Sequence, residues 1–264
     1  MPIIGVREIR TSNYTLYYID TFSDEFKQLI REQLRGIWSG FSMADSLPDF
    51  YSYTNTLKWF LERYNQKDAK TKKGMIGELL AHILLNNLND DITSLSILKN
   101  KEEKSIKKGF DIIYCELSND KLWYTEVKSG RSETGSVNST NYNNILLKRA
   151  KKSINDMINE RRDSLWESAL IDVEIMIRES DGKIDLKNLL SNDSPIMKTD
   201  QKKNVILISS LYHNLTDCIE EASLLDFHTD TCSENIFEEV KVISIQKNTF
   251  EAVAQFLTDE LSSS

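Results

Sequence analysis

The chain has 264 residues, of which 40% are hydrophobic, and its 33 basic and 41 acidic side chains give a formal charge of −8. A chain of this length buries a substantial core, and 9 glycines and 3 prolines leave little sequence for long flexible linkers. Collagen-like, mucin-like and wholly disordered classes are therefore excluded. We expect a single α/β domain spanning residues 1–264.

Location and metal chemistry are limited by what the sequence lacks. No apolar run approaches the roughly 20 residues of a membrane-spanning helix, and the N-terminus lacks the pattern of a secretory signal. The scattered cysteines Cys115, Cys218 and Cys232 indicate a cytoplasmic protein without disulfides. With only 3 histidines and no Cys/His cluster, a structural zinc site is not expected, whereas carboxylates remain available for a hard cation.

Residues 1–63 are predicted to form a mixed N-terminal extension. Apolar and polar side chains alternate along residues 14–19, and the segment is rich in β-formers, which predicts a strand. Ser23 then opens an amphipathic helix that runs to residue 38. A turn at Pro48 precedes a second helix toward Tyr64.

Residues 73–88 carry apolar side chains at helical spacing and form the clearest predicted helix. Gly74, Gly77 and Ala81 lie on a neighbouring stripe, which predicts a close approach to another element, most simply a sheet. Glu78 borders that stripe. An acid held there is expected to have a partner or a metal.

Three β-like segments follow, at residues 94–99, 110–115 and 121–128. The loop between the last two has hairpin composition, so Asp111 and Glu126 should lie on adjacent antiparallel strands. Side chains alternate along a strand, so Glu126 and Lys128 share one face.

The remaining elements follow a loop at residues 129–141. Residues 143–162 are predicted to form a helix whose buried stripe includes Ile145. Two further strands and two further helices are predicted, at residues 205–209 and 240–245 and at residues 215–227 and 249–261. We divide the chain into a core at residues 73–210 and an acidic C-terminal part at residues 211–264 that packs on it.

Charge is unevenly distributed along the chain. Residues 1–63 carry a net charge of −1, residues 64–162 carry +5, and residues 163–264 carry −12. The basic excess is clustered. The clusters on either side of the strands of Asp111 and Glu126 supply the predicted nucleic-acid contacts, which are Lys107, Lys108, Lys148, Arg149, Lys151 and Lys152. The alternative is that each lysine run is only a solvated face. The acidic block is expected to face a protein partner or the rim remote from the site.

Glu78, Asp111, Glu126 and Lys128 are the residues of this scaffold that can do chemistry together. Neighbouring carboxylates repel one another unless a cation lies between them, and Mg²⁺ accepts such oxygens while keeping several waters. Lys128 can orient a nucleophile or stabilise charge on a phosphate. The predicted reaction is metal-dependent phosphodiester hydrolysis.

Three short motifs occur in helix-strand-strand order: Gly77-Glu78, Gly109-Phe110-Asp111 and Glu126-Val127-Lys128. This pattern resembles the PD-(D/E)XK nuclease superfamily over residues 73–162, except that no proline precedes Asp111. The resemblance implies an α/β fold with a restriction-endonuclease-like core, a mixed sheet flanked by helices. It further implies that Asp111 and Glu126 bind Mg²⁺ or Mn²⁺ and that Lys128 is the catalytic lysine. Glu78 is then an additional acid of the metal site, which reaches the cation directly or through water.

More narrowly, the chain resembles HamA-type effectors of anti-phage systems such as Hachiman. This resemblance rests on the chain length, the glycine-containing helix at residues 74–85 and the segments at residues 110–114 and 124–130. It implies a nuclease that acts on DNA beside a helicase partner. No membrane partner or small-molecule ligand is expected.

Several alternatives stay open at this stage. Acid-x-Lys triplets are common in this chain, and Glu239-Val240-Lys241 also lies on a predicted strand. It lacks the arrangement around Glu126, which has a strand acid at hairpin distance, a preceding glutamate helix and a following basic helix. The charges around Glu126 can form a half-buried ion-pair network instead of a catalytic site. The protein is then a catalytically silent adaptor that holds DNA and a partner. RNA is not excluded as the substrate. His82 is most simply a structural residue, and Ser209, Ser210 and His213 lack a nearby Asp for a hydrolase triad.

Overall fold

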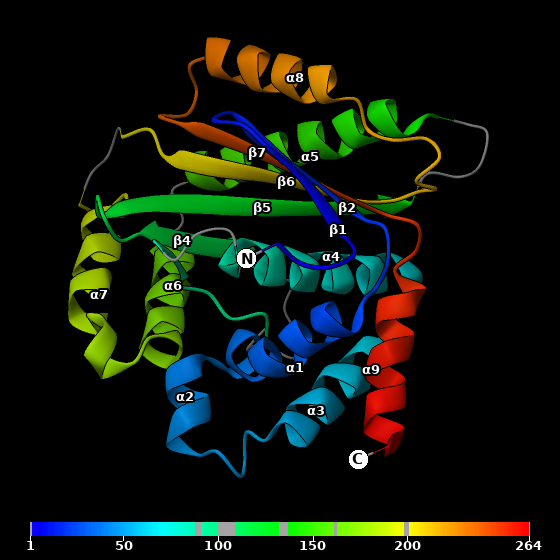
Figure 1. The fold of residues 1–264 in the computed structure, drawn as a ribbon. Coiled ribbons are helices and arrows are strands. Elements are labelled where there is room, and N and C mark those ends of the chain that lie inside the picture. Colours follow the sequence, from blue (N-terminus) through cyan, green and yellow to red (C-terminus); the bar gives the residue numbers. More distant parts are fainter. Residues whose placement is uncertain are drawn as a thin grey trace.

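The computed structural model describes residues 2–87, 91–99, 109–131, 137–160, 163–197 and 201–263 (Figure 1). These ranges form a seven-stranded sheet in the order β1-β2-β7-β6-β5-β4-β3, with helices on both sides. The predicted α/β fold with a mixed sheet flanked by helices is confirmed. The strands are β1 (Val6–Arg10), β2 (Tyr14–Ile19), β3 (Ile92–Ser94), β4 (Ile112–Glu116), β5 (Lys121–Arg131), β6 (Asn204–Tyr212) and β7 (Val240–Lys247).

The α-helices of the described ranges are distributed along the chain. They are α1 (Asp24–Ser39), α2 (Phe41–Ser46), α3 (Tyr53–Asn65), α4 (Ala69–Asn86), α5 (Ser139–Asn159), α6 (Asp163–Met176), α7 (Lys183–Asn192), α8 (Glu221–Ser233) and α9 (Glu251–Ser263). None of them is long and apolar enough to cross a membrane.

The centre of the sheet is parallel and its edges are antiparallel. Strands β2, β7, β6 and β5 pair in parallel, while β4, β3 and β1 are added in antiparallel register. Strand β2 comes from the N-terminal segment and β7 from the C-terminal segment. Both segments therefore contribute strands to the same sheet as the predicted core.

The sheet separates two hydrophobic cores. One core packs α1, α3, α4 and α9 against the face we call the α4 face. The other packs α5, α6, α7 and α8 against the opposite face, which we call the α5 face. Alternation along β5 divides its side chains between them: Val127 joins the α4-face core, whereas Tyr124 joins the α5-face core.

Side-chain caps fix the beginnings of the long helices. Ser23 accepts a hydrogen bond from the Phe26 N–H and starts α1 as predicted. Asp68 caps α4 and Asn138 caps α5, so both helices begin four residues before their predicted starts at residues 73 and 143. Both caps lie upstream of the apolar periodicity that marked the helices, which is why the periodicity alone placed the starts too late.

The prediction of a strand at residues 94–99 is wrong, because β3 ends at Ser94. Beyond it the Ser96 hydroxyl, not a backbone carbonyl, accepts the Ile113 N–H. Leu98 then donates its N–H to the Ile37 carbonyl of α1, so the chain leaves the sheet. The helix predicted at residues 215–227 is also misplaced, since α8 begins at Glu221 after a turn.

Gly77 is the point of close contact between α4 and the sheet. A Cβ atom at this position would lie 1.9 Å from Ser129 Oγ and 3.1 Å from the Cβ atoms of Ser129 and Ser210. A Cβ at Gly74, by contrast, would meet nothing within 4 Å. The predicted close approach is therefore real at Gly77 and absent at Gly74.

These two glycines make a matched pair of substitutions. Gly77→Ala should lower the free energy of unfolding by about 1–3 kcal/mol, because the added methyl overpacks the contact with β5 and β6. Gly74→Ala should raise it by up to about 1 kcal/mol, because alanine favours the helix and nothing obstructs it. Urea unfolding of both variants checks the pair. Equal effects of the two substitutions would show that Gly77 does not set the distance between α4 and the sheet.

Candidate functional site

The hairpin of β4 and β5 brings Asp111 beside Glu126. Ile112 pairs with Thr125 in antiparallel register, so Asp111 lies opposite Glu126 at the next position. Its Oδ2 accepts the backbone N–H of Val127 at 2.8 Å. Phe110 fixes this entry to the strand, because its ring packs against Tyr124 with centroids 4.6 Å apart. Two residues separated by 15 positions in the sequence are thus neighbours.

Glu126 is buried on the α5 face of the sheet, with 3% of its surface exposed. Its Oε1 accepts a hydrogen bond from Ser153 Oγ of α5 at 2.8 Å and also pairs with Lys128 Nζ. Its Oε2 is buried and has no hydrogen-bond partner in the described part of the chain. A carboxylate with one bare buried oxygen is costly unless a proton or a cation meets it.

Neighbouring charges and burial shift the protonation of this pair. Burial and the repulsion of Asp111 raise the pKa of Glu126 to about 8. Burial alone lowers the pKa of Lys128, but the carboxylates of Glu126, Asp111 and Glu78 outweigh it, so the pKa is raised. Lys128 is therefore held as an ammonium beside a carboxyl group that titrates near neutrality. Such perturbed groups are typical of functional sites.

Glu78 approaches from the other side of the sheet. Its helix α4 packs on the α4 face, where its neighbour Gly77 meets Ser129, while Glu126 contacts α5 on the opposite face. The charge of Glu78 reaches Lys128. Within the described ranges, however, no group of three or more His, Cys, Asp or Glu side chains is placed to hold a metal ion. The structure thus brings Asp111, Glu126 and Lys128 together and leaves Glu78 outside a shared ligand group.

The two grouped carboxylates fit a hard divalent cation. Mg²⁺ is commonly bound by one or two carboxylates and keeps several waters, so Asp111 and Glu126 suffice as protein ligands. The bare buried Oε2 of Glu126 is the atom of this site that most needs a cation. A cation there would also offset the repulsion that Asp111 exerts on Glu126.

The raised pKa of Glu126 makes a prediction for stability without metal. Because the pKa in the folded state lies above the ordinary value of 4.5, the contribution of Glu126 to stability is full below about pH 4.5 and is lost as the pH rises through about 8. Between those values the wild type should lose up to about 1.4 kcal/mol per pH unit relative to Glu126→Gln. Urea unfolding of both proteins in chelator from pH 5.5 to 9 measures this difference. Parallel stability curves would show that the carboxyl group titrates normally.

Helix α5 carries the predicted nucleic-acid contacts that the structure describes. Lys148 and Arg149 are exposed and form no ion pair with any described residue. Lys151 pairs with Glu234 of α8 at 2.6 Å, and Lys152 pairs with Asp156 of its own helix at 2.7 Å. Lys107 and Lys108 lie outside the described residues.

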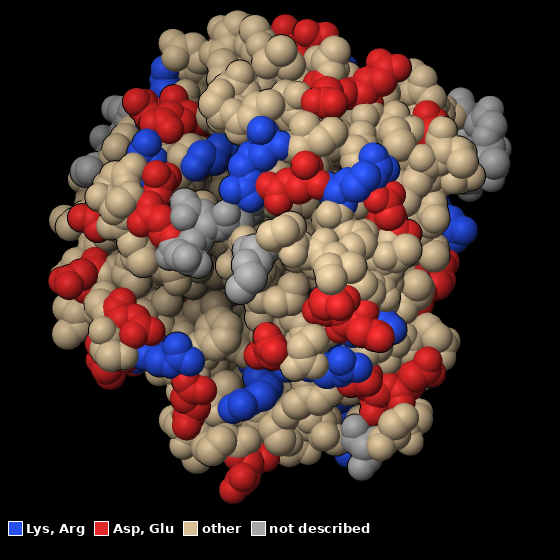
Figure 2. All heavy atoms as spheres, viewed as in Figure 1, with Lys and Arg blue, Asp and Glu red and all other residues tan. Residues whose placement is uncertain are grey.

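Acidic and basic side chains are interspersed on the face shown in Figure 2 and do not form a field of one sign. Ile145, predicted to lie in the buried stripe, is 43% exposed. The exposed cations Lys148 and Arg149 thus share the open side of α5 with an apolar side chain.

The second triplet on a strand, Glu239-Val240-Lys241, has a structural explanation. Glu239 pairs with Lys121 at 2.7 Å, and Lys241 pairs with Glu116 at 3.5 Å and lies over the Trp123 ring. These contacts tie β7 and the segment before it to the β4–β5 hairpin. Glu239 and Lys241 therefore have partners of opposite charge, which accounts for both side chains without a catalytic role.

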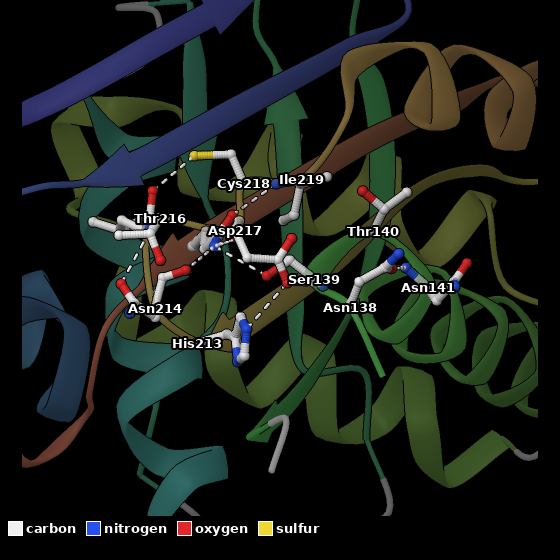
Figure 3. Close-up of polar contacts among 12 residues, drawn as sticks. Asn138, Ser139, Thr140, Asn141, His213, Asn214, Thr216, Asp217, Cys218 and Ile219 are labelled. Atoms are coloured by element: carbon white, nitrogen blue, oxygen red, sulfur yellow. Dashed lines mark hydrogen bonds and ion pairs between the residues drawn. The ribbon is translucent and has the colours of Figure 1, made fainter. Parts of the chain in front are cut away.

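His213 has an aspartate beside it, but the two side chains do not belong to a hydrolase triad. His213 Nε2 lies 3.1 Å from Asp217 Oδ2, which also accepts the Ser139 N–H at the start of α5 (Figure 3). Ser139 contributes only its backbone N–H to this contact, and its hydroxyl accepts a hydrogen bond from Gln246 Nε2 at 3.2 Å. This arrangement holds the turn at residues 213–219 against the N-terminus of α5. It is not the hydroxyl-imidazole-carboxylate order of a hydrolase.

Two other polar residues, His82 and Asn144, also have structural surroundings. His82 is fully buried in α4. Asn144 donates its side-chain amide to Ser223 of α8 at 2.8 Å, which joins the two helices. Packing accounts for His82, and the contact with Ser223 accounts for Asn144.

Ser153 is the neighbour of Glu126 that the sequence did not reveal. It lies three residues after Ala150 and one before Ile154, both fully buried, so it borders the predicted apolar stripe of α5. A serine beside such a stripe is the sequence signal that could have pointed to Ser153. Nothing in the sequence links it to a strand residue 27 positions earlier.

One of the comparisons with known proteins gives a family match. The model of the HamA family matches residues 5–261, which is nearly the whole chain. A search of curated proteins finds no match. The match includes the helix of Glu78, the hairpin of Asp111 and Glu126, and helix α5. The resemblance to HamA-type effectors is thereby confirmed, and the chain belongs to the HamA family.

Proposed function

We propose that this chain is a metal-dependent nuclease that hydrolyses DNA phosphodiester bonds as the effector of a bacterial anti-phage defence system. The observation that carries the proposal is the buried carboxylate of Glu126, flanked by Asp111 and Lys128, with one oxygen lacking a hydrogen-bond donor in the described ranges. Membership in the HamA family supports the role in Hachiman-type defence. A helicase partner is part of the same proposal and follows from the family resemblance.

Asp111 and Glu126 would hold Mg²⁺, with Mn²⁺ as a substitute. When bound, the cation supplies Lewis-acid polarisation of a phosphate and an activated water. The protein's own side chains hold the cation and stabilise the charge on the substrate. Asp111, anchored by the Val127 N–H, keeps one carboxylate at the strand end, and burial keeps Glu126 in a single place. The ammonium of Lys128 stabilises the charge that develops on the phosphate or orients the attacking nucleophile.

Helix α5 provides a path for the substrate to this site. Ser153 touches Glu126, and Arg149 lies four residues earlier, which is about one turn along nearly the same side of the helix. A phosphate backbone that follows the exposed side of α5 would therefore pass close to the carboxylates. Lys148 and Arg149 are able to bind it, because neither is neutralised by a described acid.

The role of α5 can be tested by its salt dependence. Replacing Lys148 and Arg149 together by alanine should weaken DNA binding and reduce the slope of log affinity against log salt by about 2, because each removed cation neutralises one phosphate. The matched control replaces Arg178 and Lys187, which already pair with Asp45 and Glu174. Fluorescence anisotropy with a short duplex at several salt concentrations measures both. An unchanged slope would remove α5 from the DNA interface.

The function itself is tested with the purified chain, Mg²⁺ and plasmid or single-stranded DNA, with and without a co-purified helicase and ATP. The proposal expects cutting that a chelator stops. An RNA of the same sequence in parallel reactions distinguishes a DNase from an RNase. Absence of cutting under all of these conditions would contradict the proposal.

A second candidate function has an observation of its own. Among the described residues no three acids assemble into a metal site, and Glu126 already has Lys128 as a counter-charge. This is also what a catalytically silent adaptor would show, with the charges serving as an ion-pair network. Such a protein would bind DNA through α5 and dock a partner, but it would not cut with any divalent metal.

A further inference from the structure

The two oxygens of the Glu126 carboxylate have different surroundings. Oε1 receives two donors, Lys128 Nζ from its own strand and Ser153 Oγ from α5 at 2.8 Å. Oε2 is buried and receives no donor from the described residues. The lone pairs of one oxygen are engaged, while those of the other are bare. A carboxylate held in this way offers a single oxygen to a cation.

Ser153 is held rigidly enough to set this orientation. Its helix is packed into the α5-face core through Ala150 and Ile154, both fully buried. The start of the helix is fixed by Asn138 and by Asp217, which accepts the Ser139 N–H. A hydroxyl on a fixed helix defines one position for its acceptor, whereas Lys128 alone, on a flexible stem, does not.

We propose that Ser153 is a positioning residue for cation binding: by sharing Oε1 of Glu126 with Lys128, it leaves Oε2 as the one oxygen that Glu126 gives to a divalent cation. The inference deepens the proposed function, because the cation is the cofactor of that reaction. It concerns binding of the metal and not the chemical step. Residues that orient a metal ligand typically change metal affinity about 10- to 100-fold when removed.

The test measures Mn²⁺ alone, titrated into the full chain after chelator treatment, with free Mn²⁺ read by electron paramagnetic resonance. Ser153→Ala should bind Mn²⁺ about 10-fold more weakly than wild type. Ser153→Thr restores the hydroxyl and should bind within about threefold of wild type, a tolerance well inside that 10-fold loss. Asn159→Ala, at the exposed end of the same helix, is the matched control and should bind as the wild type does. Glu126→Ala should lose the binding.

Two results would overturn the proposal. One is equal affinity of wild type and Ser153→Ala for Mn²⁺ while Glu126→Ala loses it, which would leave Ser153 with a purely structural hydrogen bond. The other is a folded Ser153→Thr variant that binds as weakly as Ser153→Ala. Thermal unfolding in chelator confirms that each variant is folded.

Failure of the proposed function is scored separately, by DNA cutting. If the wild type never cuts and Ser153→Ala still weakens Mn²⁺ binding, the nuclease proposal fails and the role of Ser153 stands. If the wild type cuts and Ser153→Ala binds Mn²⁺ normally, the nuclease proposal stands and the proposed role of Ser153 fails.

Discussion

Glu126→Ala is expected to reduce Mg²⁺-dependent DNA cutting by at least about 10³-fold, because it removes the buried ligand of the cation that the reaction uses. Folding should survive. The substitution deletes a buried carboxyl whose pKa is already raised to about 8, so the folded state loses a group that it holds at a cost when ionised. Initial rates of plasmid cutting, normalised to folded protein by circular dichroism, measure the effect.

The chain supplies its own control for this experiment. Glu239 occupies the same position in a second Glu-Val-Lys triplet, but it is half exposed and paired with Lys121. Glu239→Ala should cut DNA at the wild-type rate and should lose no more than about 1 kcal/mol of stability, as expected for an exposed ion pair. Equal loss of cutting in both variants would show that the Glu126 site has no special role.

Lys128→Ala is the second substitution with a large expected effect. Without the ammonium, charge on the phosphate is no longer stabilised, and we expect cutting to fall about 10²- to 10³-fold. DNA affinity should change little, because Lys148 and Arg149 still bind the phosphates. Single-turnover rates at saturating enzyme separate this effect on the reaction from an effect on binding.

Lys241→Ala is the matched control, since that lysine pairs with Glu116 and lies over Trp123. It should cut at the wild-type rate. A Lys128→Ala variant that cuts normally but binds DNA more weakly would reassign Lys128 from the reaction to the substrate interface.

The uneven charge of the sequence is partly balanced inside the molecule. Acids of the C-terminal block pair with cations from earlier segments: Glu234 with Lys151, Glu239 with Lys121, Glu251 with Arg131 and Glu260 with Arg31. These pairs join the C-terminal part to the rest of the fold. The acidic residues that remain exposed are the ones available for a partner, and binding to that partner stays a prediction.

Local signals account for the parts of the fold that the sequence predicted. Ser23 and the apolar spacing behind it specify α1, and the turn composition after β4 specifies the hairpin. The same hairpin explains why Asp111 and Glu126 were expected to meet, because their proximity depends only on a short antiparallel pairing. Features set within about one turn or one hairpin are readable from the residues themselves.

Tertiary packing decides what the sequence did not predict. Helices α6 and α7 were not predicted, and they are positioned by buried residues such as Trp166 and Leu190. Helix α4, which carries Glu78, packs on the face of the sheet opposite to α5, which contacts Glu126, and periodicity carries no information about that choice. Ser153 reaches Glu126 only because α5 crosses β5 on the other face. Each of these requires the strand order, which local patterns do not specify.

The most direct test of the central claim, that Asp111 and Glu126 hold the cation with which the chain cuts DNA, is anomalous diffraction from crystals soaked in Mn²⁺. The account predicts one anomalous peak within bonding distance of carboxyl oxygens of both residues, with Oε2 as the ligand atom of Glu126. An anomalous peak elsewhere on the protein, or none at these carboxyl groups at saturating Mn²⁺, would contradict it.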